Sequence, residues 1–185
     1  KTVVLNFPLD VQSAESVAAK SIEDFQLSSL GGVVPNDAGV ERLAEAITRS
    51  SRPVFIAGRG GRDAKSEILG LAKHVGALVA TSAVAKGLFN EDEFNIGISG
   101  GFSSPTTAEL IQNADLIVSF GCALNMWTMR HGRLIGEDTV VAQIDWDESK
   151  IGAHRDVDVP VVGDSAETAK ALRSALEDEA GTRYR

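Results

Sequence analysis

A turn rich in glycine holds the residues of this sequence that are best suited to bind a phosphate group. Gly58, Gly60 and Gly61 follow the apolar run VFIA at residues 54–57, and Asp63 comes just before a helical pattern. Glycine permits positive φ angles and close backbone approach, and the N–H groups of a following helix attract anions. We therefore expect a buried strand, a tight turn with positive φ, and a helix capped by Asp63. The spacing lacks the third glycine of GxGxxG, so a turn needed only for packing is an equal alternative.

Two carboxylates follow a later apolar run in the segment QIDWD. Asp145 ends the run TVVAQI, and Asp147 comes two residues after it. An acidic residue at the end of such a strand often binds a ribose hydroxyl, so both are candidate ligand contacts. The alternative is that they only form a turn and cap a short helix.

The histidines and the cysteine show no spacing that would support metal or nucleophile chemistry. His74, His131 and His154 are scattered, without HxxxH or a neighbouring glutamate at helical spacing, and we expect ordinary surface histidines. Cys122 follows Gly121 behind an apolar run and has no base paired with it by motif, so we expect a small core residue.

A segment rich in aromatic, sulfur-containing and basic residues follows the apolar run at residues 115–120. Residues 125–133, NMWTMRHGR, contain Trp127, two Met and three basic side chains. This composition favours contact with a ligand or a partner domain. A helix that packs Trp127 into the core would explain the segment nearly as well.

The apolar pattern places these candidates on alternating strands and helices. We expect strands at residues 54–57, 77–81, 115–120, 139–144 and 159–162. We expect four helices. The first begins after a cap at residue 36 or 37, the second spans residues 64–75, the third spans 106–113, and the fourth runs from a cap at Ser165 to residue 177. A long loop is expected at residues 82–105. This alternation predicts an α/β fold, a doubly wound, Rossmann-like parallel sheet of five or six strands flanked by helices.

The first 35 residues differ from the rest. Residues 2–5 form a β-branched run that stops at Pro8, and residues 10–35 show no sustained helical period. We expect the end of a strand whose sheet lies elsewhere, followed by a linker. Because the chain opens on KTVVLNFPLDVQ without Met, we also expect a piece excised from a longer protein.

Composition limits the classes of partner and compartment. The 185 residues include 26 acidic and 18 basic side chains, a net charge of −8, with no basic block to follow a nucleic acid backbone. A single cysteine excludes a disulfide within the chain, and no apolar stretch approaches the roughly 20 residues that span a bilayer. We expect a cytoplasmic protein without nucleic acid or membrane partners.

Five separated segments resemble a known domain. RPVFIAGRGG, ATSAVAKGLF, NADLIVSFGCALN, QIDWDESKIGAH and DVPVVGD follow one another as in the central domain of thiamine diphosphate-dependent enzymes of the acetolactate synthase type. KTVVLNFPLDVQ resembles the exit of the preceding pyrimidine-binding domain, so residues 1–35 would end that domain and residues 36–185 would form the central one.

The resemblance implies a parent enzyme whose catalytic parts lie outside this chain. In the family, thiamine diphosphate and Mg²⁺ sit between the first and third domains of different subunits, which implies a homo-oligomer. The partners of this chain would be the flanking pyrimidine- and diphosphate-binding domains. No residue of this chain matches the family's catalytic glutamate or its GDG...N metal motif, so no catalytic or metal residue is carried over.

Some members of the family bind FAD or ADP in the central domain. The residues that match such contacts, with Arg59 of the glycine turn added, are Gly58, Arg59, Gly60, Gly121, Asp145, Gly163 and Asp164. This chain has GCALNM where flavin-binding relatives carry a GARFDD-like stretch, and Gly101-Phe102-Ser103 in place of an MHG-like loop. These departures argue against a flavin and leave an adenine nucleotide or an empty crevice open.

Two functions follow as hypotheses. The leading one is a noncatalytic central domain that braces the cofactor-binding domains of an enzyme acting on 2-oxo acids, by decarboxylation or carboligation. The rival is a free-standing domain that binds FAD or ADP without thiamine chemistry. A dehydrogenase half is disfavoured by the missing third glycine.

Overall fold

The structure of the protein, a computed structural model, describes residues 3–15 and 32–177. Its contacts divide the chain into two units, Lys1–Gly31 and Gly32–Arg185. In the described part of the first unit, helix α1 (Leu9–Gln12) follows an exposed segment at residues 3–8 that forms no strand. Residues 3–5 pair with no strand of the described chain, and Thr2 lies outside the described residues. The expectation that they end a strand whose sheet lies elsewhere stays a prediction.

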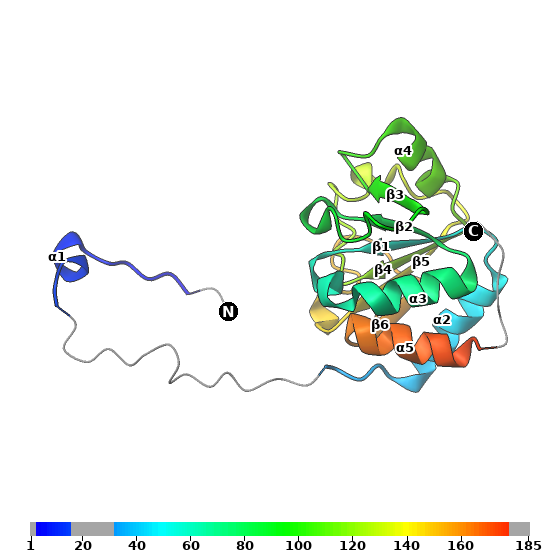
Figure 1. Cartoon of the computed structure of the whole chain (residues 1–185), viewed down its shortest axis with the longest axis horizontal. Coiled ribbons are helices and arrows are strands. Elements are labelled where there is room, and N and C mark those ends of the chain that lie inside the picture. Colours follow the sequence, from blue (N-terminus) through cyan, green and yellow to red (C-terminus); the bar gives the residue numbers. More distant parts are fainter. Residues whose placement is uncertain (1–2, 16–31, 178–185) are drawn as a thin grey trace. The chain divides into compact units, whose positions relative to one another are not determined.

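The second unit is built on a six-stranded sheet in the order β3-β2-β1-β4-β5-β6 (Figure 1). All neighbouring strands are parallel, as expected for β-strands joined by helical crossovers. The strands are β1 (Pro53–Ala57), β2 (Leu78–Thr81), β3 (Asn95–Ile98), β4 (Leu116–Phe120), β5 (Val140–Asp145) and β6 (Val159–Val162). The doubly wound α/β prediction is confirmed, at the larger of the two strand numbers.

The chain adds strands on one side of β1 as far as β3 and then on the other side from β4 onward, so the switch in strand order lies between β1 and β4. β1 pairs with β2 on one side and β4 on the other, and every residue of β1 and β4 is buried. This burial explains the continuous apolar runs, which are typical of a parallel sheet covered on both faces. β6 lies at one edge of the sheet and contains Pro160, paired with Gln143.

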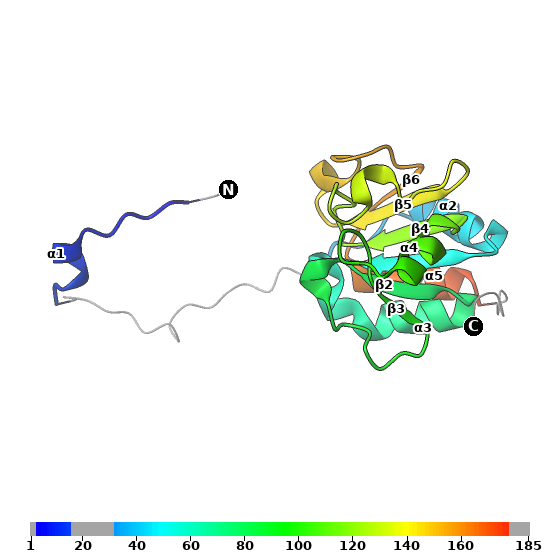
Figure 2. The ribbon, with the colours of Figure 1, turned by 90° about the horizontal axis from the view of Figure 1, so that it is seen from above.

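Helices cover both faces (Figures 1 and 2). One core cluster joins the sheet to three helices, α2 (Asp37–Arg49), α3 (Lys65–Val75) and α5 (Ser165–Ala175). The other cluster joins the opposite face to α4 (Pro105–Gln112) and to the loop after β4. No helix in the described ranges, 3–15 and 32–177, is long and apolar enough to cross a membrane.

The helix ends follow local chemistry, with two corrections. Asn36 caps α2 by accepting a 2.7 Å hydrogen bond from the N–H of Gly39, and Gly76 ends α3 with φ of 70°. Asp63 does not cap α3, because a 3₁₀ turn, η2 (Arg59–Ala64), intervenes and the helix has no side-chain cap. The cap of α5 is Asp164 rather than Ser165, which is already the first helical residue.

The loop expected at residues 82–105 contains structure that the sequence pattern did not indicate. The short turn η3 (Ala83–Ala85) follows β2, and strand β3 lies at the edge of the sheet. β3 is only half-buried along its length, and Gly97 interrupts its apolar character. An edge strand of four residues leaves too weak an alternation to be separated from a loop.

Candidate functional site

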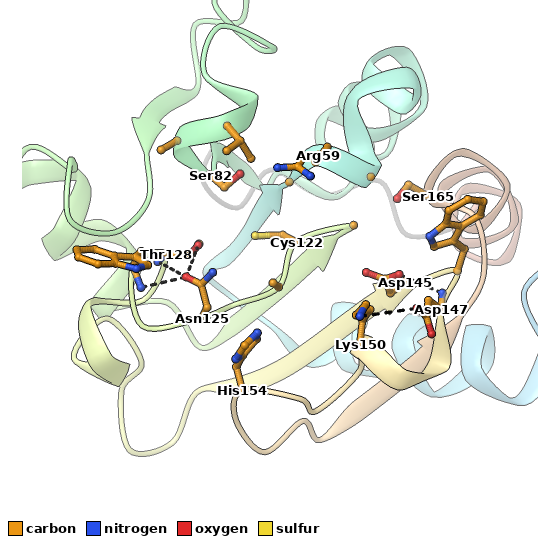
Figure 3. A pocket seen from close by; sticks show the side chains of 18 of the residues that line it. Arg59, Ser82, Cys122, Asn125, Thr128, Asp145, Asp147, Lys150, His154 and Ser165 are labelled. Atoms are coloured by element: carbon orange, nitrogen blue, oxygen red, sulfur yellow. Dashed lines mark hydrogen bonds and ion pairs between the residues drawn. The ribbon is translucent and has the colours of Figure 1, made fainter. Parts of the chain in front are cut away.

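A cavity of about 960 Å³ opens at the carboxyl ends of the strands. Its lining includes Gly58 after β1, Ser82 after β2, Gly121 after β4, Asp145 at the end of β5 and Gly163 after β6. In an open parallel sheet, this end of the strands, at the point where the strand order reverses, is where ligands bind. Figure 3 shows the side chains that surround it.

Two glycine turns meet at the floor of this cavity. Gly58 donates a 2.9 Å hydrogen bond to the carbonyl oxygen of Phe120, and Gly60 donates one of 3.1 Å to that of Gly121. A Cβ on Gly58 would lie 2.2 Å from the oxygen of Gly121, so no other residue fits. The close approach is therefore confirmed, but the positive φ expected in the first turn is wrong: Gly58 has φ of −102°, and the positive φ of 54° belongs to Gly121.

All seven residues that the family resemblance and the glycine turn assign to nucleotide contact line the cavity. They are Gly58, Arg59, Gly60, Gly121, Asp145, Gly163 and Asp164. The structure thus brings together residues that are up to about a hundred positions apart, because each follows a parallel strand of the same sheet. Their contact with a ligand stays a prediction.

The carboxylates at the ends of β5 and β6 are already engaged with backbone N–H groups. Asp145 accepts a 3.0 Å hydrogen bond from the N–H of Asp147, and Asp147 accepts one of 3.0 Å from that of Ser149. The hydroxyl and N–H of Ser149 lower the pKa of the Asp147 carboxyl below its ordinary value. Asp164 accepts bonds of 2.8 and 3.1 Å from the first turn of α5. Asp147 therefore forms the turn and caps the short helix, and its contact with a ligand stays a prediction.

The loop after β4 is fixed by a small set of hydrogen bonds. The side-chain oxygen of Asn125 accepts from the N–H groups of Trp127, at 3.0 Å, and Thr128, at 3.1 Å. Arg130 donates two bonds of 3.0 Å, to the carbonyl oxygens of Gly100 and Ser103. The loop after β3 is thereby joined to the loop after β4.

The exposure of Trp127 tests one of the two interpretations of the aromatic segment. Trp127 is 69% exposed and lines the cavity, whereas Met129 of the same segment is fully buried. The alternative in which Trp127 packs into the core is wrong. Phe102, 77% exposed, lines the cavity too and comes from the loop that Arg130 binds.

Cys122 and the three histidines differ in how far they are buried. Cys122 is 2% exposed and belongs to the core, and burial raises its pKa to about 11, so its thiol stays neutral at pH 7. His131 and His154 are exposed, as expected, and His154 lines the cavity. His74 is half-buried instead, because its ring lies within hydrogen-bond distance of the carbonyl oxygen of Leu176 and so joins α3 to the end of α5.

Sequence reasoning missed several lining residues. The polar ones outside residues 125–133 are Ser82, Lys150, His154 and Ser165. None carries a motif, but Ser82 directly follows a buried strand, and that position was a usable signal. Buried Gln143 was also missed: its side chain donates to the carbonyl oxygens of Cys122, at 3.3 Å, and Lys150, at 3.2 Å, and so supports two lining loops.

The side chains of the cavity offer charged and hydrogen-bonding groups to a ligand. The cavity presents carboxylates, hydroxyls, one arginine, one lysine and exposed aromatic rings, a set suited to orient a small polar ligand. Within residues 3–15 and 32–177, no group of three or more His, Cys, Asp or Glu side chains is placed to hold a metal ion.

Comparison with known proteins agrees with this geometry. Residues 40–172, well over half of the chain, match the family model for the thiamine pyrophosphate enzyme, central domain. The chain is 29% identical over 184 residues to a probable acetolactate synthase large subunit of Methanocaldococcus jannaschii, a match that covers 94% of this chain and 30% of that protein. It is 28% identical over 189 residues to the acetolactate synthase large subunit of Corynebacterium glutamicum, covering 95% of this chain and 30% of the relative.

A solved structure shows the same fold. The X-ray structure of a putative thiamin diphosphate-dependent enzyme isolated from Mycobacterium smegmatis superposes with a TM-score of 0.62 at 22% identity. The match covers 81% of this chain and 29% of that one. This chain thus spans about 30% of the length of the curated relatives it matches. With the strand order, the glycine turns and the family match in agreement, the chain belongs to the family of thiamine pyrophosphate enzyme central domains.

Proposed function

We propose that this chain is the noncatalytic central domain of a thiamine diphosphate-dependent enzyme that acts on 2-oxo acids, by decarboxylation or carboligation. The observation that carries the proposal is the family match over residues 40–172, together with relatives that are acetolactate synthase large subunits. The comparisons give no support to the rival, a free-standing domain that binds FAD or ADP.

The donor set supports a bracing role rather than a catalytic one. Thiamine diphosphate is bound in proteins through Mg²⁺, which takes oxygen ligands in near-ideal octahedral geometry. The GDG...N motif that holds this metal in the family has no counterpart in the sequence, and no three acidic, histidine or cysteine side chains come together in the described residues. We therefore assign Mg²⁺ and the cofactor to the flanking domains, and to this chain the task of holding those domains apart at a fixed distance.

The organisation of the parent protein belongs to the same proposal. Residues 1–35 would end the preceding pyrimidine-binding domain, residues 36–185 would form the central domain, and the diphosphate-binding domain would follow. The parent would be a cytoplasmic lyase or transferase and a homo-oligomer. The share of the relatives that the chain covers, about 30%, leaves room for two further domains of similar size.

The cavity would serve the parent enzyme as a ligand crevice. We propose that the seven predicted residues contact the ligand that enters it, since all seven line one cavity at the carboxyl end of the sheet. A flavin is disfavoured because Ala123 stands where a GARFDD-like stretch has its arginine, and Asn125 and Met126 stand where it has its carboxylates. A buried diphosphate without those partners loses its charge-assisted hydrogen bonds.

The test compares the 185-residue chain with the full-length protein that contains it. Both are purified and supplied with thiamine diphosphate, Mg²⁺ and a panel of 2-oxo acids that includes pyruvate, and CO₂ release and carboligation products are measured. We expect turnover by the full-length protein and none by the chain alone. Turnover by the chain, or a full-length protein that neither binds thiamine diphosphate nor consumes any 2-oxo acid, would contradict the proposal.

A further inference from the structure

The large hydrophobic side chains that are exposed in residues 32–177 lie at one end of the domain. Five of them follow the ends of strands β2 to β5: Val84, Phe102, Met126, Trp127 and Trp146. Helices α2 to α5 expose none in the described part of the chain. Exposed apolar side chains are ordinary when they are scattered, but a group of them at one end of a domain marks an interaction surface.

The loops after β3 and β4 are joined into one unit, residues 99–103 with 124–131, here called the double loop. The N–H of Gly101 donates a 2.9 Å hydrogen bond to the carbonyl oxygen of Trp127, and the two bonds of Arg130 described above fasten the same loops. The two most exposed aromatic rings of the domain are therefore carried by a fixed backbone. Such rings lose little conformational entropy on binding, which favours association.

The backbone of the double loop is strained. Leu124, Arg130 and His131 have φ of 47°, 47° and 58°, and they are the only residues other than glycine with positive φ in the described part of the chain. Such conformations persist only where the surrounding structure imposes them, and they gather at functional positions. Strain and exposed aromatic rings both cost free energy, and the folding of this domain by itself accounts for neither.

The polypeptide enters the domain at the same end. The carbonyl oxygen of Val33 accepts a 2.7 Å hydrogen bond from the N–H of Asp164, which lines the cavity, and a Cβ on Gly163 would lie 2.9 Å from the Cβ of buried Pro35. Val33 and Val34 are themselves exposed. A domain attached ahead of α2 is thus tethered at the end that carries the double loop, and the tether raises its effective concentration there. Helix α5 begins at this end and runs away from it, so the chain that follows α5 starts out from the opposite end.

We propose that the double loop is the surface on which the preceding, pyrimidine-binding domain of the parent enzyme docks, with Phe102, Met126 and Trp127 as its apolar contacts. The inference rests on the function proposed above and identifies the end of this domain that contacts a neighbour. Aromatic side chains and methionine are enriched in the buried centre of protein interfaces. A small ligand in the cavity is a poorer match, because Met126 is exposed but does not line the cavity.

Oxidation by hydrogen peroxide, read by peptide mass spectrometry on the full-length protein, tests whether the surface is covered. Met126 and Met129 are the two methionines of the 185 residues, and in this domain Met126 is 47% exposed whereas Met129 is fully buried. If a neighbouring domain covers the double loop, we expect Met126 to be oxidised within about threefold of the rate of Met129, since exposure governs oxidation. A faster rate for Met126 overturns the proposal.

Two variants of the full-length protein test the role of the aromatic ring. Trp127→Ala should speed the oxidation of Met126 by about fivefold or more, because the contact that covers it is weakened. Met129 should stay slow, which shows that the domain is still folded. Arg42→Ala, which removes an exposed side chain from α2, is the control and should change neither rate. An equal effect of the two substitutions contradicts the proposal.

Photochemical cross-linking identifies the occupant. Phe102→p-benzoylphenylalanine in the full-length protein should cross-link to a peptide of the preceding domain. A cross-link to the following domain or to residues 36–177 of a second copy, or no cross-link at all, overturns the assignment. Turnover of 2-oxo acids is measured on the same samples. An active enzyme that oxidises Met126 freely contradicts the docking alone, and an inactive protein with protected Met126 contradicts the proposed function alone.

Discussion

The N–H of Gly60 donates a 3.1 Å hydrogen bond to the carbonyl oxygen of Gly121, and this bond joins the turns that follow the two central strands. Gly121 has no room for a side chain either, because a Cβ on it would lie 2.4 Å from the Cα of Gly60. The floor of the cavity is therefore backbone packed on backbone, with no side chain between the two turns.

Gly121→Ala should destabilise the domain severely. Gly121 has φ of 54°, and the new methyl group would overlap the backbone of Gly60, which cannot move away as a flexible side chain could. We expect a loss of more than about 2 kcal/mol in the free energy of unfolding, measured in urea. Gly101→Ala is the matched control, since nothing lies within 4 Å of its added Cβ, and it should change stability by less than about 0.5 kcal/mol. Equal stabilities for the two variants would show that the close packing of the turns is not what requires glycine.

Asp115 should contribute stability that is lost in acid. Burial raises the pKa of its carboxyl, but hydrogen bonds from the Ser50 hydroxyl and from the N–H groups of Ser51 and Arg52 outweigh this, so the pKa lies below 3.8. A folded-state pKa below the unfolded one gives stability that is complete above the unfolded value and disappears as pH falls through the folded value.

We therefore expect Asp115→Asn to lower the free energy of unfolding by about 2 kcal/mol at pH 7. The difference from the wild type should shrink as the pH is lowered below 3.8. Glu137→Gln, in the exposed part of the loop before β5, is the control and should leave the curve unchanged. Urea titrations at a series of pH values measure the effect, and a difference that is constant with pH would refute it.

Cys122 should react with thiol reagents only after unfolding. The side chain is 2% exposed, and its pKa of about 11 keeps the thiolate scarce at pH 8. Because the sequence contains one cysteine, the thiol count reports this position alone. We expect the folded protein to react with a disulfide reagent more slowly than the protein unfolded in urea, by a factor of about a hundred or more. A pKa raised by two units lowers the thiolate fraction, and with it the rate, by about that factor on its own. A native rate equal to the unfolded rate would show that the cavity exposes the sulfur.

Arg130→Ala should loosen two loops at once. Its two hydrogen bonds to the backbone of the loop after β3 hold that loop against residues 125–133, and Arg130 itself has φ of 47°, a conformation that needs support from its surroundings. Hydrogen exchange should become faster at residues 100–103 and at 127–132, while residues 54–57 stay protected. Arg133→Ala removes an exposed charge three residues later and should change neither loop.

Much of the sheet was predictable because burial on both faces leaves a plain pattern. The runs that became β1 and β4 are wholly buried and, apart from Ser119, apolar, so their residues alone identify them. Half-buried β3 with Gly97 gave no comparable pattern. The glycine turn after β1 and Asp145 were singled out by the same logic, since strand ends in a parallel sheet converge. Gly121, Gly163 and Asp164 came from the family resemblance instead.

The features that the sequence did not predict correctly depend on contacts between residues far apart in the chain. Whether Gly58 or Gly121 has positive φ is decided by how the two turns meet, and neither turn contains that information by itself. Ser82 was missed because a single serine carries no pattern, and its hydroxyl, buried without a hydrogen-bond partner, becomes visible only when its surroundings are known.

Pro160 in edge strand β6 affects how copies of this domain can meet. A proline has no amide hydrogen, and the exposed ring of Pro160 interrupts the row of donors that an added strand would need. Strands at the edge of a sheet are otherwise ready templates for aggregation. Association by extending the sheet past β6 is therefore disfavoured, and contacts between molecules on this side of the domain must use side chains and loops instead.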